Sequence, residues 1–116
     1  MNVIFHINER NKWETTFNSA FNMYAAAAAK GQAAEIYIVA NGEAVEIMTA
    51  QEGPLAKQRS RLHEAFPKKI QVCFCKKAMD LRSLTLPEDL NQAEVVPSAA
   101  YFIVELQEKG FAYIKS

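Results

Sequence analysis

The sequence predicts an α/β protein, a three-layer sandwich around a mostly parallel five-stranded sheet with strand order 2-1-3-4-5. Short apolar runs rich in Val, Ile and aromatic residues alternate along the chain with segments of helical periodicity. The links between them are short, and parallel strands need helical crossovers of this kind. The apolar runs are continuous, as is typical of strands covered on both faces. We therefore expect helices on both sides of the sheet.

The first third of the chain predicts two strands joined by a long helix. Residues 3–7 are β-branched and aromatic, and we interpret them as a central strand. Aromatic and small residues then recur at helical spacing over residues 12–29, and Asn11 with Glu14 has the pattern of a capping pair. Residues 35–40 form the second apolar run, which predicts a second buried strand.

The rest of the chain continues the alternation. We expect strands at residues 70–75, 93–96 and 111–114, short helical segments at 43–48 and 76–81, and helices at 53–66 and 98–109. Ser98 is the predicted N-cap of the last helix. That helix is apolar nearly all round at residues 99–106, which is more than one face of so small a sheet can cover. The pattern therefore predicts a homo-oligomer.

Length and composition narrow the class of protein. The chain has 116 residues, enough for one hydrophobic core, so we expect a single domain over residues 1–116. Its 13 Lys and Arg residues balance its 13 Asp and Glu residues, which argues against a nucleic-acid partner. The N-terminus does not resemble a signal peptide, and no apolar run approaches the ~18 residues of a membrane span. We expect a cytoplasmic protein with no membrane partner.

The candidate site residues lie where the predicted strands end. Ligands of open α/β sheets bind beyond the carboxyl ends of the strands, at the point where strand order reverses. The first three strands end at His6, at the turn Asn41-Gly42 and at Cys75. In a 2-1-3 order the first and third strands are neighbours. The imidazole of His6 is then within reach of the thiol of Cys75.

Cys75 is the candidate catalytic residue. It precedes a short predicted helix and is followed by Lys76 and Lys77, and a helix N-terminus and nearby cations both favour the nucleophilic thiolate. The alternative is that Cys75 is a small buried apolar residue, a common role of free cysteine. Cys73, two residues earlier in the same strand, is interpreted as a core residue. Cys73 and Cys75 are two residues apart in the sequence, but an extended strand holds their Cα atoms too far apart in space for a disulfide.

The sequence contains no motif for a metal site or for a flavin or phosphate site, and only weak support for a functional histidine. His6 could orient a ligand or pair with a thiolate, but a single histidine near a strand end is more often structural. The two histidines and two cysteines have no metal-site spacing, so we expect no metal. The loop after the first strand, residues 8–11, contains no glycine to cradle a phosphate, so we expect no flavin or other cofactor.

Several segments together resemble the DsrE/DsrF-like family of small proteins related to sulfur relay and sulfur oxidation. These segments are residues 5–9 with Lys12-Trp13, residues 39–45, Phe74-Cys75 with Met79, residues 95–98 and residues 110–115. The resemblance covers nearly the whole chain. It implies a flavodoxin-like fold and trimers or hexamers. In those members that work as sulfur carriers, it also implies a cysteine after the third strand that carries sulfane sulfur as a persulfide, a role that maps here to Cys75. The chain has Lys77-Ala78 where relatives often have Asn-Thr.

Two hypotheses of function follow. In the first, the protein handles sulfur: Cys75 accepts and donates a sulfur atom, possible partners are sulfur-transfer proteins, and the binding residues are His6, Asn41, Gly42, Lys76 and Lys77. In the second, the protein is a non-catalytic oligomeric module that binds a small ligand or a partner protein at the same cleft. A hydrolase or dehydrogenase is disfavoured because no nucleophile with its base and no cofactor loop is visible.

Overall fold

The computed structural model describes all 116 residues and contains one sheet of five parallel strands. The strands are β1 (Asn2–Ile7), β2 (Glu35–Ala40), β3 (Gln71–Cys75), β4 (Glu94–Val96) and β5 (Ala112–Lys115). The α-helices are α1 (Trp13–Ala29), α2 (Gly53–Ala65), α3 (Lys76–Leu81) and α4 (Ala99–Glu108). Four 3-10 helices connect them: η1 (Arg10–Lys12), η2 (Gly42–Thr49), η3 (Phe66–Lys68) and η4 (Glu88–Leu90). The predicted α/β class and the predicted elements are confirmed.

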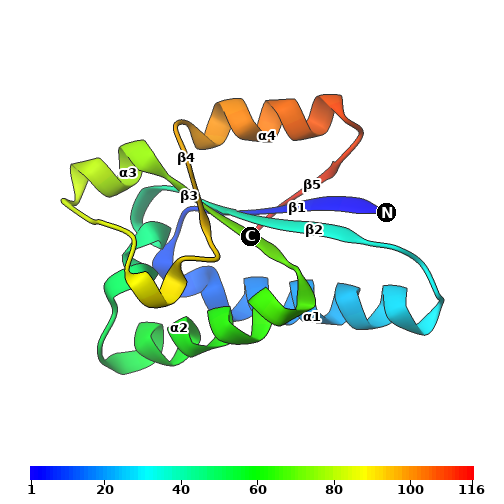
Figure 1. Ribbon diagram of the computed structural model, residues 1–116, viewed down its shortest axis with the longest axis horizontal. Coiled ribbons are helices and arrows are strands. Elements are labelled where there is room, and N and C mark those ends of the chain that lie inside the picture. The colour runs from blue at the N-terminus through cyan, green and yellow to red at the C-terminus, as the bar shows by residue number, and fades with distance from the viewer.

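The helices form the outer two of three layers. Figure 1 shows α1 and α2 together on one side of the sheet, and α4 on the opposite side with α3 near its N-terminal end. We call the first side the α1/α2 face and the second the α4 face. Strands β1, β2 and β3 lie in the interior of the sheet, and β4 and β5 form its edges.

The predicted strand order is wrong. The order in the sheet is β4-β3-β2-β1-β5, so β2 separates β1 from β3. The chain steps in one direction from β1 through β4, and right-handed crossovers then place α1 and α2 on the same face. The connection from β4 returns across the whole sheet to β5, which places α4 on the other face. Periodicity reports which residues are buried, but it does not report the direction of each crossover.

The hydrophobic core is one cluster of 32 buried residues that extends over both faces of the sheet. On the α1/α2 face, the rings of Trp13 and Phe17 lie 5.2 Å apart between their centroids, and both residues are fully buried. The indole Nε1 of Trp13 donates a hydrogen bond of 3.0 Å to the carbonyl oxygen of Ala44. This bond attaches the start of α1 to η2.

Segment η2 covers the carboxyl ends of the central strands. Its residues Ala44, Val45, Ile47 and Met48 are fully buried. The segment begins at Gly42, whose φ of +54° is a conformation that side chains disfavour. A Cβ on Gly42 would lie 3.1 Å from the carbonyl oxygen of Asn8, so the loops after β1 and β2 are in close contact. The space beyond the ends of β1 and β2, part of the strand-end cleft expected from the sequence, is therefore occupied by the protein's own loops.

The two predicted helix caps have different outcomes. Ser98 caps α4 as predicted, and its Oγ accepts a bond of 3.2 Å from the backbone nitrogen of Tyr101. The cap predicted at Asn11 is wrong, because Asn11 lies inside η1 and the N-cap of α1 is Lys12, with no side-chain cap bond. The helical turn begins two residues earlier than the capping pattern indicates.

An ion pair holds the long connection between α3 and β4 against α2. Arg59 donates two hydrogen bonds, of 2.8 and 2.9 Å, to the carboxylate of Asp89, and its Nε donates to the carbonyl oxygen of Met48. His63 lies 3.2 Å from the same carboxylate. The hydrogen bond from Arg59 is the main reason why the pKa of Asp89 falls to about 2.

Candidate functional site

The candidate residues lie near the carboxyl edge of the sheet, on the α4 face. His6, Val39 and Cys73 occupy the same row across β1, β2 and β3. Residues in register in a parallel sheet point to the same face, and side chains alternate along each strand, so Cys75 points to that face as well. The register places Asn41 one row beyond Ala40 and therefore level with Cys75, because Ala40 pairs with Phe74. Cys75 pairs with Val96 of the edge strand β4, and Asn41 follows the end of β2 on the other side of β3.

The sequence-based prediction that His6 reaches Cys75 is wrong, because β2 lies between their strands. His6 instead has two other partners. Its Nδ1 lies 2.5 Å from the hydroxyl oxygen of Tyr113 on β5, and its Nε2 lies 2.9 Å from Oδ1 of Asn41. The Oδ1 of Asn41 only accepts, so Nε2 carries the proton, and Nδ1 accepts from the tyrosine O–H. The result is a hydrogen-bonded chain from Tyr113 through His6 to Asn41.

The environment of His6 favours the neutral imidazole. Burial is the main cause that lowers the pKa of His6 from its ordinary 6.5, and the charge of Lys115 acts in the same direction. The hydrogen bond with Asn41 opposes them in part. A neutral ring with its proton on Nε2 keeps the Asn41 amide in one orientation. The Nδ2 of Asn41 has no protein partner and is free to donate.

The two cysteines differ in accessibility. Cys73 is fully buried, and burial raises the pKa of its thiol to about 12, with a smaller contribution from Glu94. Cys75 is 7% exposed and occupies the N-cap position of α3. Both thiols are free. Cys73 is therefore a core residue, and Cys75 is the thiol nearer to solvent.

The two lysines after Cys75 are exposed and line an open hollow of about 390 Å³, together with Leu81 and Pro97. Lys76 forms an ion pair of 2.5 Å with Asp80, one turn along α3. Lys77 has no ion-pair partner within the chain. Of the two cations expected beside Cys75, only Lys77 is free to interact with an anionic sulfur or with a partner.

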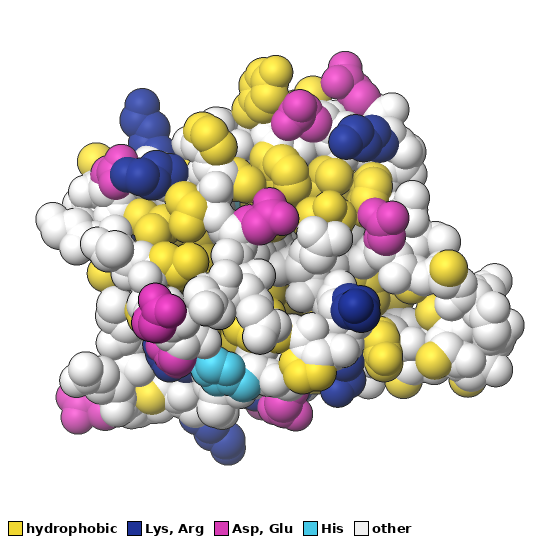
Figure 2. All heavy atoms as spheres, in the orientation of Figure 1, with side chains coloured by type: hydrophobic (Ala, Val, Ile, Leu, Met, Phe, Trp, Pro, Cys, Tyr) yellow, Lys and Arg dark blue, Asp and Glu magenta, His cyan; other side chains and the backbone are white.

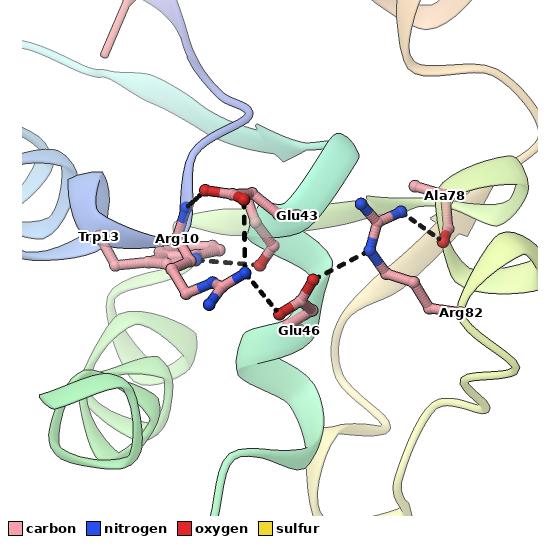
Figure 3. A network of polar contacts seen from close by, with 7 residues as sticks. Arg10, Trp13, Glu43, Glu46, Ala78 and Arg82 are labelled. Atoms are coloured by element: carbon pink, nitrogen blue, oxygen red, sulfur yellow. Dashed lines mark hydrogen bonds and ion pairs between the residues drawn. The ribbon is translucent and has the colours of Figure 1, made fainter. Parts of the chain in front are cut away.

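Gly42 has a structural role in η2, and the polar network around that segment was not predicted. Figure 3 shows Arg10 approaching η2 from the side of the loop after β1 and Arg82 approaching it from the side of α3. Arg10 lies 3.4 Å from Glu43 and 3.3 Å from Glu46, and Arg82 lies 3.1 Å from the second carboxylate oxygen of Glu46. This network joins three loops at the carboxyl edge of the sheet.

The sequence analysis also missed Tyr113. It lies 107 residues from His6 along the chain. No spacing rule connects residues at that separation, and only the position of β5 beside β1 brings them together. The closing segment that carries Tyr113 is, however, one of those on which the family resemblance rests.

The model of the DsrE/DsrF-like family matches residues 1–116, which is the entire chain. The chain belongs to the DsrE/DsrF-like family. Members of this family are associated with sulfur relay, and the resemblance noted in the sequence is confirmed. No curated protein matches the chain significantly.

Two solved structures share the DsrE-like fold of this chain. A protein of unknown function from Methanobacterium thermoautotrophicum superposes with a TM-score of 0.78 at 22% identity, over 99% of this chain and 98% of that one. A conserved protein of unknown function from Bacteroides thetaiotaomicron gives a TM-score of 0.74 at 14% identity, over 99% of this chain and 94% of that one. At these identities the similarity concerns the fold alone.

The chain has neither a metal-binding cluster nor a membrane-spanning helix. His, Cys, Asp and Glu side chains nowhere gather in a group of three that could hold a metal ion. None of the helices has the length and apolar character needed to span a membrane.

Proposed function

We propose that this DsrE-like protein carries sulfane sulfur on Cys75 as a persulfide. The main support is the contrast between the two thiols on the α4 face: Cys73 is fully buried in the core, whereas Cys75 is 7% exposed at the end of β3, directly before the two lysines that line an open hollow. Membership of the DsrE/DsrF-like family supports the same role.

The proposed reaction is an exchange between sulfur atoms. The thiolate of Cys75 attacks the terminal sulfur of a persulfide on a donor, a new S–S bond forms on Cys75, and the donor's own S–S bond breaks to release its thiolate. The proton lost from Cys75 is taken up by the departing donor or by water. No oxidant or reductant is consumed, because one persulfide replaces another.

Asn41 is the proposed positioning residue for the sulfur. Its Oδ1 is engaged by His6, and this leaves the Nδ2 hydrogens available to a neighbouring anion. Asn41 follows the end of β2, the strand that pairs with β3, and in this proposal its amide donates to the thiolate or to the persulfide of Cys75. Tyr113 and His6 hold the amide in place in this scheme, and Lys77 contributes positive charge at the hollow.

Mass spectrometry after incubation with a persulfide donor tests the sulfur-carrier proposal. We expect a gain of roughly 32 Da, the mass of one sulfur atom on a cysteine thiolate. The gain should persist in Cys73→Ser and vanish in Cys75→Ser. An Asn41→Leu variant should accept sulfur more slowly, with an unchanged fold by circular dichroism. Sulfur loading that survives in Cys75→Ser contradicts the proposal.

A second candidate function is an oligomeric binding module, and the exposed apolar surface of α4 and β5 favours it. Tyr101 is 69% exposed and Val104 is 54% exposed on α4, and every residue of β5 is exposed. Figure 2 shows hydrophobic side chains gathered in the upper half of the view, over the α4 face. A second copy of the chain is the proposed occupant, because β5 has a free edge and both of its faces are open.

Sedimentation velocity tests the proposed self-association. We expect the wild-type protein to sediment as a trimer or hexamer and a Tyr101→Glu, Val104→Glu double variant to sediment as a monomer. The matched control is Glu64→Lys on α2, an exposed residue on the other face, which should leave the assembly intact. A wild-type monomer at high protein concentration excludes this role. The sulfur-carrier and module functions separate in Cys75→Ala, which abolishes only the first.

A further inference from the structure

The largest cavity of the molecule plays no part in the proposed sulfur chemistry. It has a volume of about 480 Å³ and lies between the start of α1, η2 and the first two turns of α2. Neither Cys75 nor the hydrogen-bonded chain from Tyr113 through His6 to Asn41 contributes a residue to it. Its size falls within the roughly 300–1,000 Å³ typical of small-molecule sites, and it lies near the carboxyl edge of the sheet, where α/β folds bind ligands.

The lining of this cavity carries uncompensated negative charge. Glu46 lies in its wall but is neutralised, because Arg10 and Arg82 balance the two glutamates of η2. Figure 3 shows these ion pairs. Two further glutamates in the lining, Glu14 and Glu52, form no ion pair within the chain. The side chain of Glu52 makes no hydrogen bond to the N-terminus of α2 that it precedes. The cavity therefore favours a cation over an anion.

Gln58 provides an independent indication of a ligand. It lines the cavity and is only 9% exposed. Its Oε1 accepts a bond of 3.2 Å from Arg61, and an arginine can only donate, so the orientation of the amide is defined. The amide nitrogen then has no partner in the protein. Every fully enclosed side-chain nitrogen or oxygen atom does have one, so this nitrogen must reach open space. The cavity that Gln58 lines provides that space.

The amide nitrogen of Gln58 is therefore a hydrogen-bond donor that is open to a ligand in the cavity. Leu55 and Pro54, beside Gln58 on α2, add an apolar wall. The cavity thus offers two carboxylates, one amide donor and a short apolar surface. A bare divalent cation fits this set poorly, because the amide N–H₂ repels it and hard cations require six or more oxygen ligands.

We propose that this cavity binds a small amino-acid-like molecule that carries an ammonium group next to an oxygen acceptor. The ammonium group binds Glu14 and Glu52, and the oxygen accepts from the Nε2 of Gln58. This inference does not depend on the role of Cys75.

Protein-observed NMR with three small probes tests the proposal. Alaninamide has both the ammonium group and the oxygen acceptor, N-acetylalaninamide lacks the charge, and propylamine lacks the acceptor. We expect alaninamide to shift the backbone signals of residues 10–14 and 50–58 and to bind about tenfold more tightly than propylamine, the value of one hydrogen bond to a buried donor. N-acetylalaninamide should not shift them. Absence of shifts with alaninamide at millimolar concentration, or shifts mapped elsewhere, overturns the proposal.

Variants assign the contacts. Glu14→Gln and Glu52→Gln should each weaken alaninamide binding about tenfold, because each removes one charge-assisted hydrogen bond. Gln58→Leu should weaken alaninamide and leave propylamine unchanged, which distinguishes loss of the amide donor from misfolding. The matched control is Glu108→Gln on α4, an exposed glutamate on the other face, and Cys75→Ser should also bind as the wild type does. Equal binding of alaninamide by Glu52→Gln and wild type contradicts the assignment.

Discussion

The two faces of the sheet differ in how completely helices cover them. On the α1/α2 face, Val3, Phe5 and Ile7 of the interior strand β1 are almost entirely buried. On the α4 face, His6 of the same strand is only half-buried, and Tyr113 beside it on β5 is exposed. A single ten-residue helix covers most of this second face, whereas two longer helices share the first. The comparison indicates that the α1/α2 face stabilises the fold and that the α4 face leaves side chains available for function.

The largest effect on stability is expected from a substitution that creates an empty space in the core of the α1/α2 face. Trp13→Ala removes a fully buried ring that packs on Phe17 and donates to Ala44, and it should lower the free energy of unfolding by about 3–5 kcal/mol. Urea unfolding followed by circular dichroism measures the change. Trp13→Phe keeps most of the apolar volume and should cost clearly less. A loss below about 1 kcal/mol for Trp13→Ala would show that α1 contributes little to the core.

A smaller effect on stability is expected at the close contact between the loops that follow β1 and β2. Gly42→Ala places a Cβ 3.1 Å from the carbonyl oxygen of Asn8 at a positive φ, and it should cost about 1–3 kcal/mol of unfolding free energy. Gly31→Ala is the control, because Gly31 also has a positive φ but has open space around it. Thermal unfolding compares the two. Equal losses would mean that the close contact between the loops has no energetic weight.

A pH-dependent effect is expected on the α4 face. The pKa of His6 is lowered in the folded state, so below about pH 6.5 the unfolded chain binds a proton more readily than the folded one. Stability contributed by the neutral ring is fully present above that pH and is lost as the pH falls towards the lowered value. Urea unfolding at about pH 7.5 and pH 5.5 should therefore show a loss that His6→Gln reduces. If the free energy of unfolding changes equally with pH in the wild type and in His6→Gln, His6 is not the titrating group.

The smallest effect on the folded chain is expected on the outer surface of α4. Tyr101→Ser removes a ring that is 69% exposed, and in dilute solution it should change the free energy of unfolding by no more than about 0.5 kcal/mol. The same substitution should reduce the dependence of the melting temperature on protein concentration, because it removes apolar area from the proposed contact between copies. A large loss in dilute solution would mean that Tyr101 stabilises the single chain.

Much of the fold was predictable because it follows from local pattern. The strand Glu35–Ala40 and the helix Lys76–Leu81 have the predicted bounds, and Ser98 caps α4, since apolar runs, turn residues and caps act over a few residues. The family was also recognisable, because its characteristic segments retain their order and spacing.

The candidate site was predictable only in part. His6, Asn41 and Cys75 do lie near the same edge of the sheet, as residues that end parallel strands must. Their neighbours were not predictable. The position of β2 between β1 and β3 separates His6 from Cys75 and makes Asn41 a partner of His6, and the return of β5 to β1 supplies Tyr113 as its other partner.

The sequence by itself determined the elements, the class of fold and the family, because burial periodicity and chain punctuation are encoded over short distances. Tertiary structure decided the strand order, the filling of the strand ends by η2, and the cavity between α1 and α2. These depend on the direction of each crossover and on contacts between residues far apart in the chain, such as Arg10 with Glu46 and His6 with Tyr113. The free energy of such contacts exists only once the sheet has assembled, so no local pattern in the sequence records it.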